Sequence, residues 1–233
     1  MITKSRETQV NGSFQNDKGI TGVMGNKGYL ENITIEEILD YELSWFKGEI
    51  ILVDNLKTFG KVIAGLMKER LLGFDTETRP SFRKGHKNKV SLIQLATGNK
   101  AYLFRINRIG IPHELAGLLA NPEITKAGVA VHDDIKFLKN IRKFSPEGFI
   151  DLQNFVRNFG IQSSGLKKLA AIILGFRISK RQQVTDWEAE VLSEPQQVYA
   201  ATDAWVCYEI YKKLTKNNNH PLPGLLPEGG PGL

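Results

Sequence analysis

The sequence has 233 residues, of which 41% are hydrophobic and 24% charged, and its formal net charge at pH 7 is +6. This composition predicts a soluble globular protein with one domain of ordinary size, because no apolar run approaches the length of a membrane span. The single cysteine, Cys207, excludes an internal disulfide, and the N-terminus lacks the apolar core of a signal peptide. We therefore expect a cytoplasmic protein, whose basic excess modestly favours a polyanionic partner.

Both ends of the chain have the composition of unstructured segments. Residues 1–32 are rich in Gly, Asn, Ser, Thr and Lys without apolar periodicity, which predicts a flexible arm, and the Pro- and Gly-rich residues 217–233 predict a disordered tail. The glycines of the arm do not make a phosphate-binding loop, because the order of Gly-Lys followed by Ser or Thr after a strand is missing. The sequence therefore predicts one folded domain over residues 33–216.

Apolar runs and helical patterns alternate within this domain. Strands are expected where β-rich apolar runs occur, at residues 49–54, 71–77, 90–97, 101–106 and 125–131. Helical spacing of apolar residues predicts a helix over residues 55–70, and further helices are expected from about Pro112, Asp133, Asp151, Gly165 and Glu194. This order predicts an α/β domain with a central mixed sheet of five to six strands flanked by helices.

Two acids, Asp75 and Glu77, stand at the end of the second predicted strand, in "LLGFDTETRP". Side chains alternate along a strand, so these two carboxylates point to the same side of the sheet. Like charges this close repel one another, and each raises the pKa of the other unless a positive group lies between them. The pair therefore indicates a site for a divalent cation, although paired acids at strand ends are common.

Further polar residues occur where strands lead into helices. Asp133 and Asp134 lie in the first turn of a predicted helix, where the helix dipole favours acids and accounts for at least one of them. Tyr199 and Asp203 are four residues apart on the last predicted helix, which places a phenol and a carboxylate on one face. Asp151 precedes a helix and is expected to be its N-cap. Each feature by itself is also typical of an ordinary protein surface.

Basic residues follow the acidic pair directly. The segment "RPSFRKGHKNK" has no acid and contains five cations, at Arg79, Arg83, Lys84, Lys87 and Lys89. A second basic group, Arg177, Lys180 and Arg181, follows a helix-like segment. A solvated loop is the plainer explanation of a charge run. Because the first run adjoins the acidic pair, we expect its residues Arg79, Arg83, Lys84 and Lys87 to contact nucleic acid.

The order of these motifs is much more specific than any one of them. With Asp75 and Glu77 in "FDTET", Asp134 in "GVAVHDD" and Tyr199 and Asp203 in "YAATD", the chain resembles the DnaQ-like 3′→5′ exonucleases of the DEDD superfamily, in the branch with a tyrosine. It is most similar to RNase D and Werner-type exonuclease domains, over roughly residues 45–216. The segment "TDWEAEVLSEPQQ" also looks like the lead-in to the last motif of RNase D-like proteins. The resemblance implies an RNase H-like fold.

The resemblance also implies a catalytic site. Its catalytic residues would be Asp75, Glu77, Asp134, Tyr199 and Asp203, and the four acids would hold two divalent cations. All-oxygen ligands suit Mg²⁺ or Mn²⁺. Asp75 would bridge both ions, Glu77 and Asp203 would complete the first, and Asp134 would hold the second, in a two-metal arrangement that activates water and stabilises the leaving oxygen. Tyr199 would orient the attacking water.

These implications predict a metal-dependent 3′→5′ exonuclease whose partner is a nucleic acid with a free 3′ end. DNA is favoured over RNA, because the sequence shows no additional helical RNA-binding domain of the kind that RNase D carries. Two alternatives remain: an RNase D-like exoribonuclease, and a nucleic-acid-binding module without catalysis, against which the filled motif positions speak. Phe82 and Leu92 are expected to wedge against the terminal bases.

Overall fold

The computed structural model describes residues 13–15, 21–23, 28–78 and 89–216. Two short strands, β1 (Ser13–Gln15) and β2 (Thr21–Val23), pair with each other. The domain itself is built from α1 (Ile35–Ile38), β3 (Glu49–Val53), α2 (Leu56–Leu66), β4 (Leu71–Thr78), β5 (Val90–Ala96), β6 (Lys100–Phe104), α3 (Ile106–Ile109), α4 (His113–Leu119), β7 (Thr125–Gly128), α5 (Val131–Ile141), β8 (Phe149–Asp151), α6 (Leu152–Phe155), the 3₁₀ turn η1 (Val156–Phe159), α7 (Leu166–Leu169), the π turn η2 (Ala170–Leu174) and α8 (Glu194–Lys216).

A six-stranded sheet in the order β3-β6-β5-β4-β7-β8 forms the centre of the domain. Strand β5 runs antiparallel to both of its neighbours, whereas the other pairings are parallel, so the predicted mixed sheet flanked by helices is confirmed. Strand β8 was not expected, because three half-buried residues give too short a pattern to distinguish from a loop. Strand β7 ends at Gly128, three residues earlier than expected.

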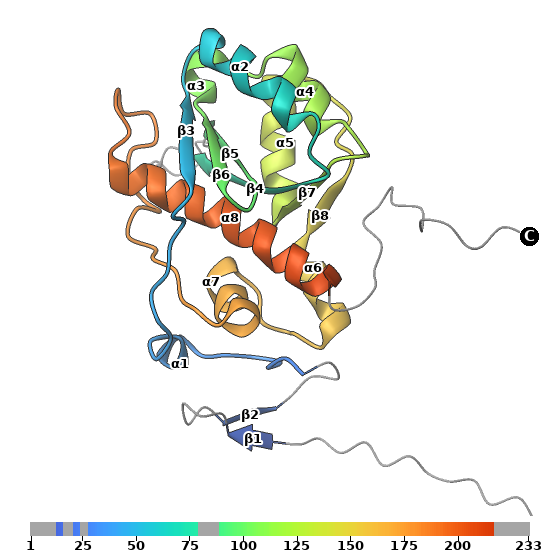
Figure 1. Cartoon of the computed structure of the whole chain (residues 1–233), viewed down its shortest axis with the longest axis vertical. Coiled ribbons are helices and arrows are strands. Elements are labelled where there is room, and N and C mark those ends of the chain that lie inside the picture. Colours follow the sequence, from blue (N-terminus) through green and yellow to red (C-terminus); the bar gives the residue numbers. More distant parts are fainter. Residues whose placement is uncertain (1–12, 16–20, 24–27, 79–88, 217–233) are drawn as a thin grey trace, which may run out of the picture.

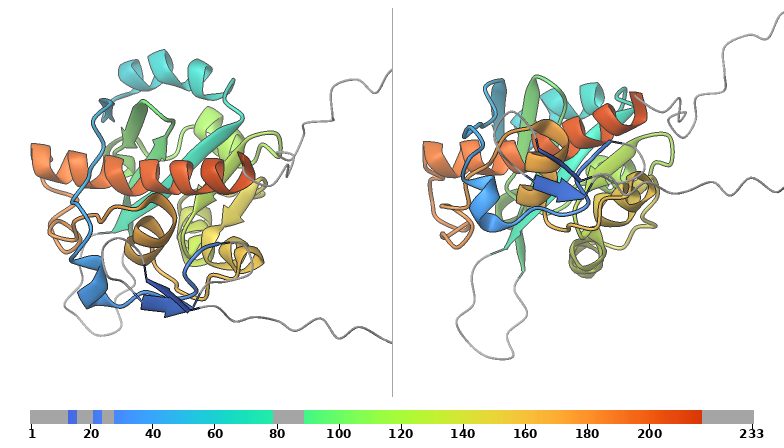
Figure 2. Two further views of the ribbon diagram at one scale, coloured as in Figure 1. Left: turned by 60° about the horizontal axis from the view of Figure 1, so that its bottom comes forward. Right: turned by 90° about the horizontal axis from the view of Figure 1, so that it is seen from below.

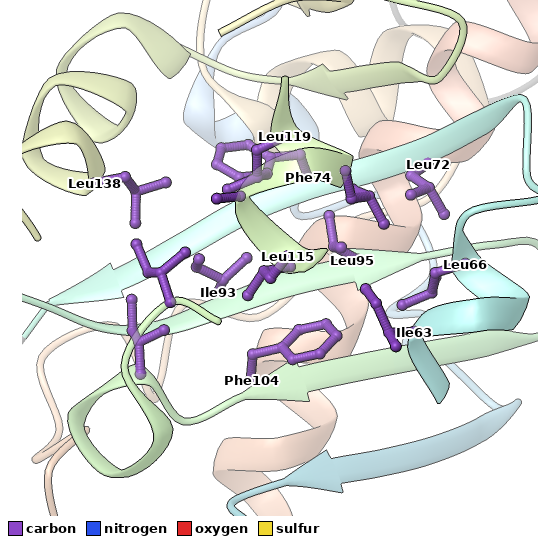
Figure 3. Close-up of a cluster of buried hydrophobic side chains, with 14 of the residues drawn as sticks. Ile63, Leu66, Leu72, Phe74, Ile93, Leu95, Phe104, Leu115, Leu119 and Leu138 are labelled. Carbon is purple, nitrogen blue, oxygen red and sulfur yellow. The ribbon is translucent and has the colours of Figure 1, made fainter. Parts of the chain in front are cut away.

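Helices cover both faces of this sheet (Figure 1). Helix α8 crosses one face, against strands β3 to β7, and α7 and η2 pack on α8 in turn (Figure 2). Helices α2, α4 and α5 cover the opposite face, where a buried cluster joins Ile63, Leu66, Leu72, Phe74, Ile93, Leu95, Phe104, Leu115, Leu119 and Leu138 (Figure 3). None of the helices in the described part of the chain is long and apolar enough to cross a membrane.

The side chains of strand β4 alternate between the two faces of the sheet. Leu72 and Phe74 point into the cluster under α2, α4 and α5, so Gly73 and Asp75 face α8. A Cβ atom on Gly73 would lie 1.8 Å from the backbone oxygen of Ala204, which means that α8 rests on bare backbone. The close packing of α8 on β4 also needs small side chains on the helix. Three buried alanines of α8 provide them, Ala200, Ala201 and Ala204.

The segment before β3 also lies against the domain. Leu30 is buried, and the backbone oxygen of Glu31 accepts hydrogen bonds from the amides of Gln162 and Ser163. Residues 28–32, the last part of the predicted arm, are therefore in contact with the segment before α7. The domain boundaries inferred from the sequence, at residues 33 and 216, stay predictions.

The contact at Gly73 gives a test of the packing. Gly73→Ala should destabilise the protein by about 1–3 kcal/mol, because the new methyl group displaces the backbone of α8. As a control, Gly60→Ala in α2 places its methyl in open space and should stabilise the protein by roughly 0.5–1 kcal/mol. Urea unfolding of both variants checks this pair, and an equally stable Gly73→Ala protein would contradict the described approach of α8.

Candidate active site

The end of β4 is open on one edge. Strand β7 pairs with Leu71–Gly73 of β4 and then turns away at Gly128, where a Cβ atom would lie 2.7 Å from the backbone oxygen of Phe74. Ala130 follows in the left-handed conformation, with φ of 55°, and its amide donates to Asp151 Oδ1 over 3.2 Å. The chain thereby turns sharply into α5, whose first turn reaches the last residues of β4.

Three acids meet on the face of β4 that α8 covers. Asp75 and Glu77 come from the strand and Asp203 comes from α8, and each of them offers a carboxylate oxygen within 4.8 Å of the others. Glu77 and Asp203 are buried and Asp75 is half-buried. The strand alternation expected from the sequence therefore places Asp75 and Glu77 side by side, and the close contact at Gly73 brings the helix acid to them.

Asp134 approaches the same site from the start of α5. Its Oδ1 accepts a hydrogen bond of 2.6 Å from Thr76 Oγ1, whose residue lies between the two strand acids. It is not among the three acids whose oxygens meet, but its charge raises the pKa of both Asp75 and Glu77. The structure thus places Asp134 at the rim of the cluster, fixed by Thr76.

Burial raises the pKa values of all four acids, and repulsion from the other acids adds to this for Asp75 and Glu77. Burial, and then the charges of neighbouring acids, hold the pKa of Asp75 well above its usual range and raise that of Glu77. Burial raises the pKa of Asp203 to about 7, against the opposing effects of its hydrogen bond to Tyr199 and of the charge of Lys180. Burial also raises the pKa of Asp134 to about 6, against the hydrogen bond from Thr76. Without a cation, the folded protein favours protonated acids here.

The three meeting carboxylates fit a divalent cation. Asp203 Oδ1 is buried and has no hydrogen-bond partner among the described residues, although buried polar atoms are normally paired. A cation bound between the acids would satisfy this oxygen and remove the repulsion. Because all the donors are carboxylate oxygens, the site suits a hard ion such as Mg²⁺ or Mn²⁺.

Tyr199 lies one helical turn before Asp203. Its hydroxyl is hydrogen-bonded to the Asp203 carboxylate, and burial together with the nearby acids raises its pKa, so it remains a neutral donor. The Trp187 ring packs against it at a centroid distance of 6.0 Å. The segment around Trp187 is anchored by Arg105, which donates to the backbone oxygens of Ala189 and, at 2.7 Å, Glu190. Packing and hydrogen bonds therefore hold the Tyr199 side chain in place.

A cavity of about 270 Å³ opens onto these acids. Apolar side chains form part of its wall, namely Val129, Leu166 and Ile178, and two lysines, Lys167 and Lys180, also line it. The cavity therefore combines an acidic floor with cations and an apolar wall. These are the groups needed to hold a phosphodiester and the sugar or base attached to it.

Comparison with known proteins gives the family of this site. A family model described as 3′-5′ exonuclease matches residues 50–218. The chain belongs to this 3′-5′ exonuclease family. Its core is the RNase H-like fold expected from the sequence, since the EXO domain of Aedes aegypti Nibbler superposes with a TM-score of 0.67 at 26% identity, covering 76% of this chain and 93% of that domain.

Two curated relatives are similar in sequence to this exonuclease domain. The bifunctional 3′-5′ exonuclease/ATP-dependent helicase WRN of Mus musculus is 34% identical over 151 residues, which is 62% of this chain and 11% of the relative. Ribonuclease D of Haemophilus influenzae is 35% identical over 130 residues, which is 55% of this chain and 32% of the relative. The chain therefore spans well under half of the length of either protein.

The residues around the site confirm some of the expectations from the sequence and contradict others. Leu92 is fully buried in the core beneath α8, so the prediction that it wedges against a base is wrong. Asp151 is the N-cap of α6, as predicted, and accepts from the Gln153 amide. Two residues of the second basic group, Arg177, Lys180 and Arg181, have different surroundings. Lys180 lines the cavity, whereas Arg177 donates to the backbone oxygen of Tyr41.

Five predicted residues lie outside the described part of the chain. They are Phe82 and the predicted nucleic-acid contacts Arg79, Arg83, Lys84 and Lys87. The sequence reasoning missed Lys167, Leu166, Ile178 and Val129 as cavity residues. The pair Lys167 and Lys168 opens α7 after Gly165, which gave a weak signal, but nothing in the sequence indicated that α7 faces β4.

The raised pKa values predict how the metal-free protein responds to pH. Because the folded acids bind protons more tightly than the unfolded ones, with ordinary values near 4, stability in chelator should fall as pH rises from about 4 through 7 and on toward about 10. Asp203→Asn should therefore raise the melting temperature of the metal-free protein at pH 8 by roughly 5 °C and flatten its pH dependence.

Calorimetry in excess chelator measures this effect. The matched control is Asp133→Asn, which alters an exposed neighbouring acid and should shift the melting temperature by less than about 2 °C. Added Mn²⁺ should stabilise the wild type more than Asp203→Asn. A metal-free Asp203→Asn protein that melts below the wild type at pH 8 would contradict the described repulsion.

Proposed function

We propose that this domain is a metal-dependent 3′→5′ exonuclease that hydrolyses phosphodiester bonds at the 3′ end of a nucleic acid. One observation carries the proposal: the oxygens of Asp75, Glu77 and Asp203 converge in a cavity, and Asp203 Oδ1 is buried without a partner among the described residues. Three carboxylates in this arrangement disfavour an anionic substrate unless cations lie between them. The family assignment supports the same chemistry.

The role that we propose for each residue follows from its position in the site. Asp75, Glu77 and Asp203 would hold the cations, with Asp134 completing the site from α5, where Thr76 fixes its carboxylate. Divalent cations bound here would supply an activated water and stabilise the charge that develops on the leaving oxygen. Tyr199 keeps its proton, so its hydroxyl is suited to orienting a water rather than to removing a proton from it.

The lysines of the cavity would bind the substrate backbone. Lys180 is near enough to Asp203 to lower its pKa, and Lys167 lines the same cavity from α7. A phosphate held between these lysines and the cations has its charge neutralised from both sides. The apolar wall of Val129, Leu166 and Ile178 would then contact the terminal nucleoside, in place of the Leu92 wedge expected from the sequence.

RNA is the substrate that we propose to test first. The expectation of DNA depended on the lack of a further RNA-binding domain, and a chain that spans part of its relatives gives no basis for that inference. The similarity to a ribonuclease D supports RNA. The experiment is a cleavage ladder on 5′-labelled single-stranded RNA and DNA of the same sequence, with Mg²⁺ and with Mn²⁺.

The ladder distinguishes the main alternatives. Stepwise shortening from the 3′ end that chelator abolishes supports the proposed exonuclease, with faster shortening of RNA expected. Binding without shortening, with either metal, would indicate a nucleic-acid-binding module that lacks catalysis. Undiminished shortening in excess chelator would contradict the metal-dependent mechanism.

Tyr199→Phe tests the role of the hydroxyl. The ring and its packing against Trp187 are kept, so a packing role predicts an unchanged rate, whereas a water-orienting role predicts a loss of about 100-fold in turnover. Single-turnover cleavage at saturating metal gives the rate, and a metal titration should show unchanged affinity. Tyr102→Phe, on β6, is the matched control and should keep wild-type turnover. Wild-type turnover in Tyr199→Phe would remove this hydroxyl from the mechanism.

Lys180→Met tests the proposed phosphate contact. Removing one cation from the cavity should raise KM by roughly tenfold and lower the slope of log affinity against log salt by about one. Lys212→Met removes an exposed lysine near the far end of α8 and serves as the control, with KM unchanged. An unchanged salt dependence in Lys180→Met would show that Lys180 does not contact a phosphate.

A further inference from the structure

A second pocket lies beside the acidic cavity. It has a volume of about 490 Å³, and it is formed by the segment before β3, the segment before Trp187 and the first turns of α8. Leu43 and Trp45 line it and are 43% and 47% exposed. Its size is typical of a site for a small molecule or for one group of a larger ligand. Ser179 and Tyr199 line both this pocket and the acidic cavity, so the two adjoin.

The exposure of Trp45 is built into the backbone. The Ser44 amide donates to the Arg177 backbone oxygen over 2.9 Å, and the Phe46 amide donates to Thr202 Oγ1 on α8 over 3.0 Å. Both neighbours of Trp45 in sequence are thus bonded to other segments, Ser44 to the stretch at Arg177 and Phe46 to α8. Because the side chain of Phe46 is buried, that of Trp45 is directed outward. The backbone that carries the indole is therefore held in place on both sides, and the indole lies at the surface.

Two cations lie near Trp45 and its pocket. Lys47 Nζ lies 5.3 Å from the centre of a Trp45 ring, and the exposed Arg181 lines the pocket. Lys180, the next residue along the chain, lines the acidic cavity instead. Glu194 is the acid among the pocket residues. An exposed aromatic ring with cations near it complements a nucleotide, whose base stacks on aromatic rings and whose phosphate is anionic.

We propose that the pocket beside Trp45 binds a base of the substrate strand upstream of the nucleotide being removed. This inference rests on the proposed exonuclease function. The acidic cavity takes the terminal nucleotide, and Tyr199 and Ser179 connect that cavity to the pocket, so a strand leaving the cavity can lay an upstream base on Trp45. Arg181 and Lys47 then lie beside its phosphates. Stacking is tolerant of base identity, so the pocket would favour single strands of any sequence.

Fluorescence tests the binding itself. Trp45 is the exposed indole, whereas Trp187 is buried and Trp205 half-buried. A decamer of uridylate whose 3′-terminal linkage is a methylphosphonate that resists cleavage, added with Mg²⁺, should quench the emission of the wild type, and Trp45→Phe should lose most of that quenching. Equal quenching in Trp45→Phe would overturn the proposal. Because this measurement needs no turnover, it shows whether the Trp45 pocket binds a nucleic acid strand even if the domain cleaves nothing.

Kinetics test whether the pocket serves the reaction. The reference substrate is the 4-nitrophenyl ester of a nucleoside 5′-monophosphate, which has no upstream base, and the second substrate is the decamer with an ordinary 3′-terminal linkage. Trp45→Ala should lower the ratio of kcat/KM for the decamer to that for the ester by roughly tenfold, mainly through KM. Leu56→Ala, which removes an exposed leucine on α2, is the matched control and should leave the ratio unchanged.

The outcomes separate the two proposals. A wild type that cleaves neither substrate with Mg²⁺ or Mn²⁺ would overturn the proposed function. A wild type that cleaves both, with an unchanged ratio in Trp45→Ala, would overturn the role of the pocket alone. If the ratio is unchanged in Trp45→Ala and the quenching is unchanged in Trp45→Phe, the exposed Trp45 surface binds something other than the substrate, such as an apolar segment of another protein.

Discussion

The contact between α8 and the bare backbone of Gly73 is the constraint on which the site depends. Asp75 and Glu77 belong to β4, whereas Tyr199 and Asp203 belong to a helix more than a hundred residues later in the sequence. The helix reaches the strand because a Cβ atom is absent at Gly73 and because alanines face it from α8. The distance between the strand acids and Asp203 is therefore set by backbone packing rather than by flexible side chains, which favours a site of fixed geometry.

This geometry opposes the stability of the metal-free fold. Four acids with raised pKa values share one buried region, and of the four only Asp203 has its pKa lowered by a neighbouring lysine, Lys180. A protein retains such repulsion when the same groups are needed for a ligand of opposite charge. Around the acids, Thr76 holds Asp134, and Trp187 packs on Tyr199. The surrounding structure thus holds the acids in place, as the proposed binding of cations and of an anionic strand requires.

Much of this arrangement was predictable from the sequence. The alternation of β4 predicted that Asp75 and Glu77 share a face, and the spacing of Tyr199 and Asp203 predicted a shared helical face. What joined these motifs was the resemblance to a family, because their contact depends on where α8 crosses the sheet. Strand β8 is too short to give a pattern, and Leu92 was misplaced because a strand buried on both faces shows no alternation. The Trp45 pocket combines three segments that are distant in sequence, so no local pattern indicated it.

The central claim is that the converging carboxylates are a cation site made by the packing of α8 on β4. Crystals of the wild type grown with Mn²⁺, and measured with X-rays at which manganese scatters anomalously, test it most directly. The account predicts an anomalous peak in direct contact with carboxylate oxygens of Asp75, Glu77 and Asp203, and a second one on the side of Asp134. Well-ordered acids without an anomalous peak between them, at a Mn²⁺ concentration that supports cleavage, would contradict it.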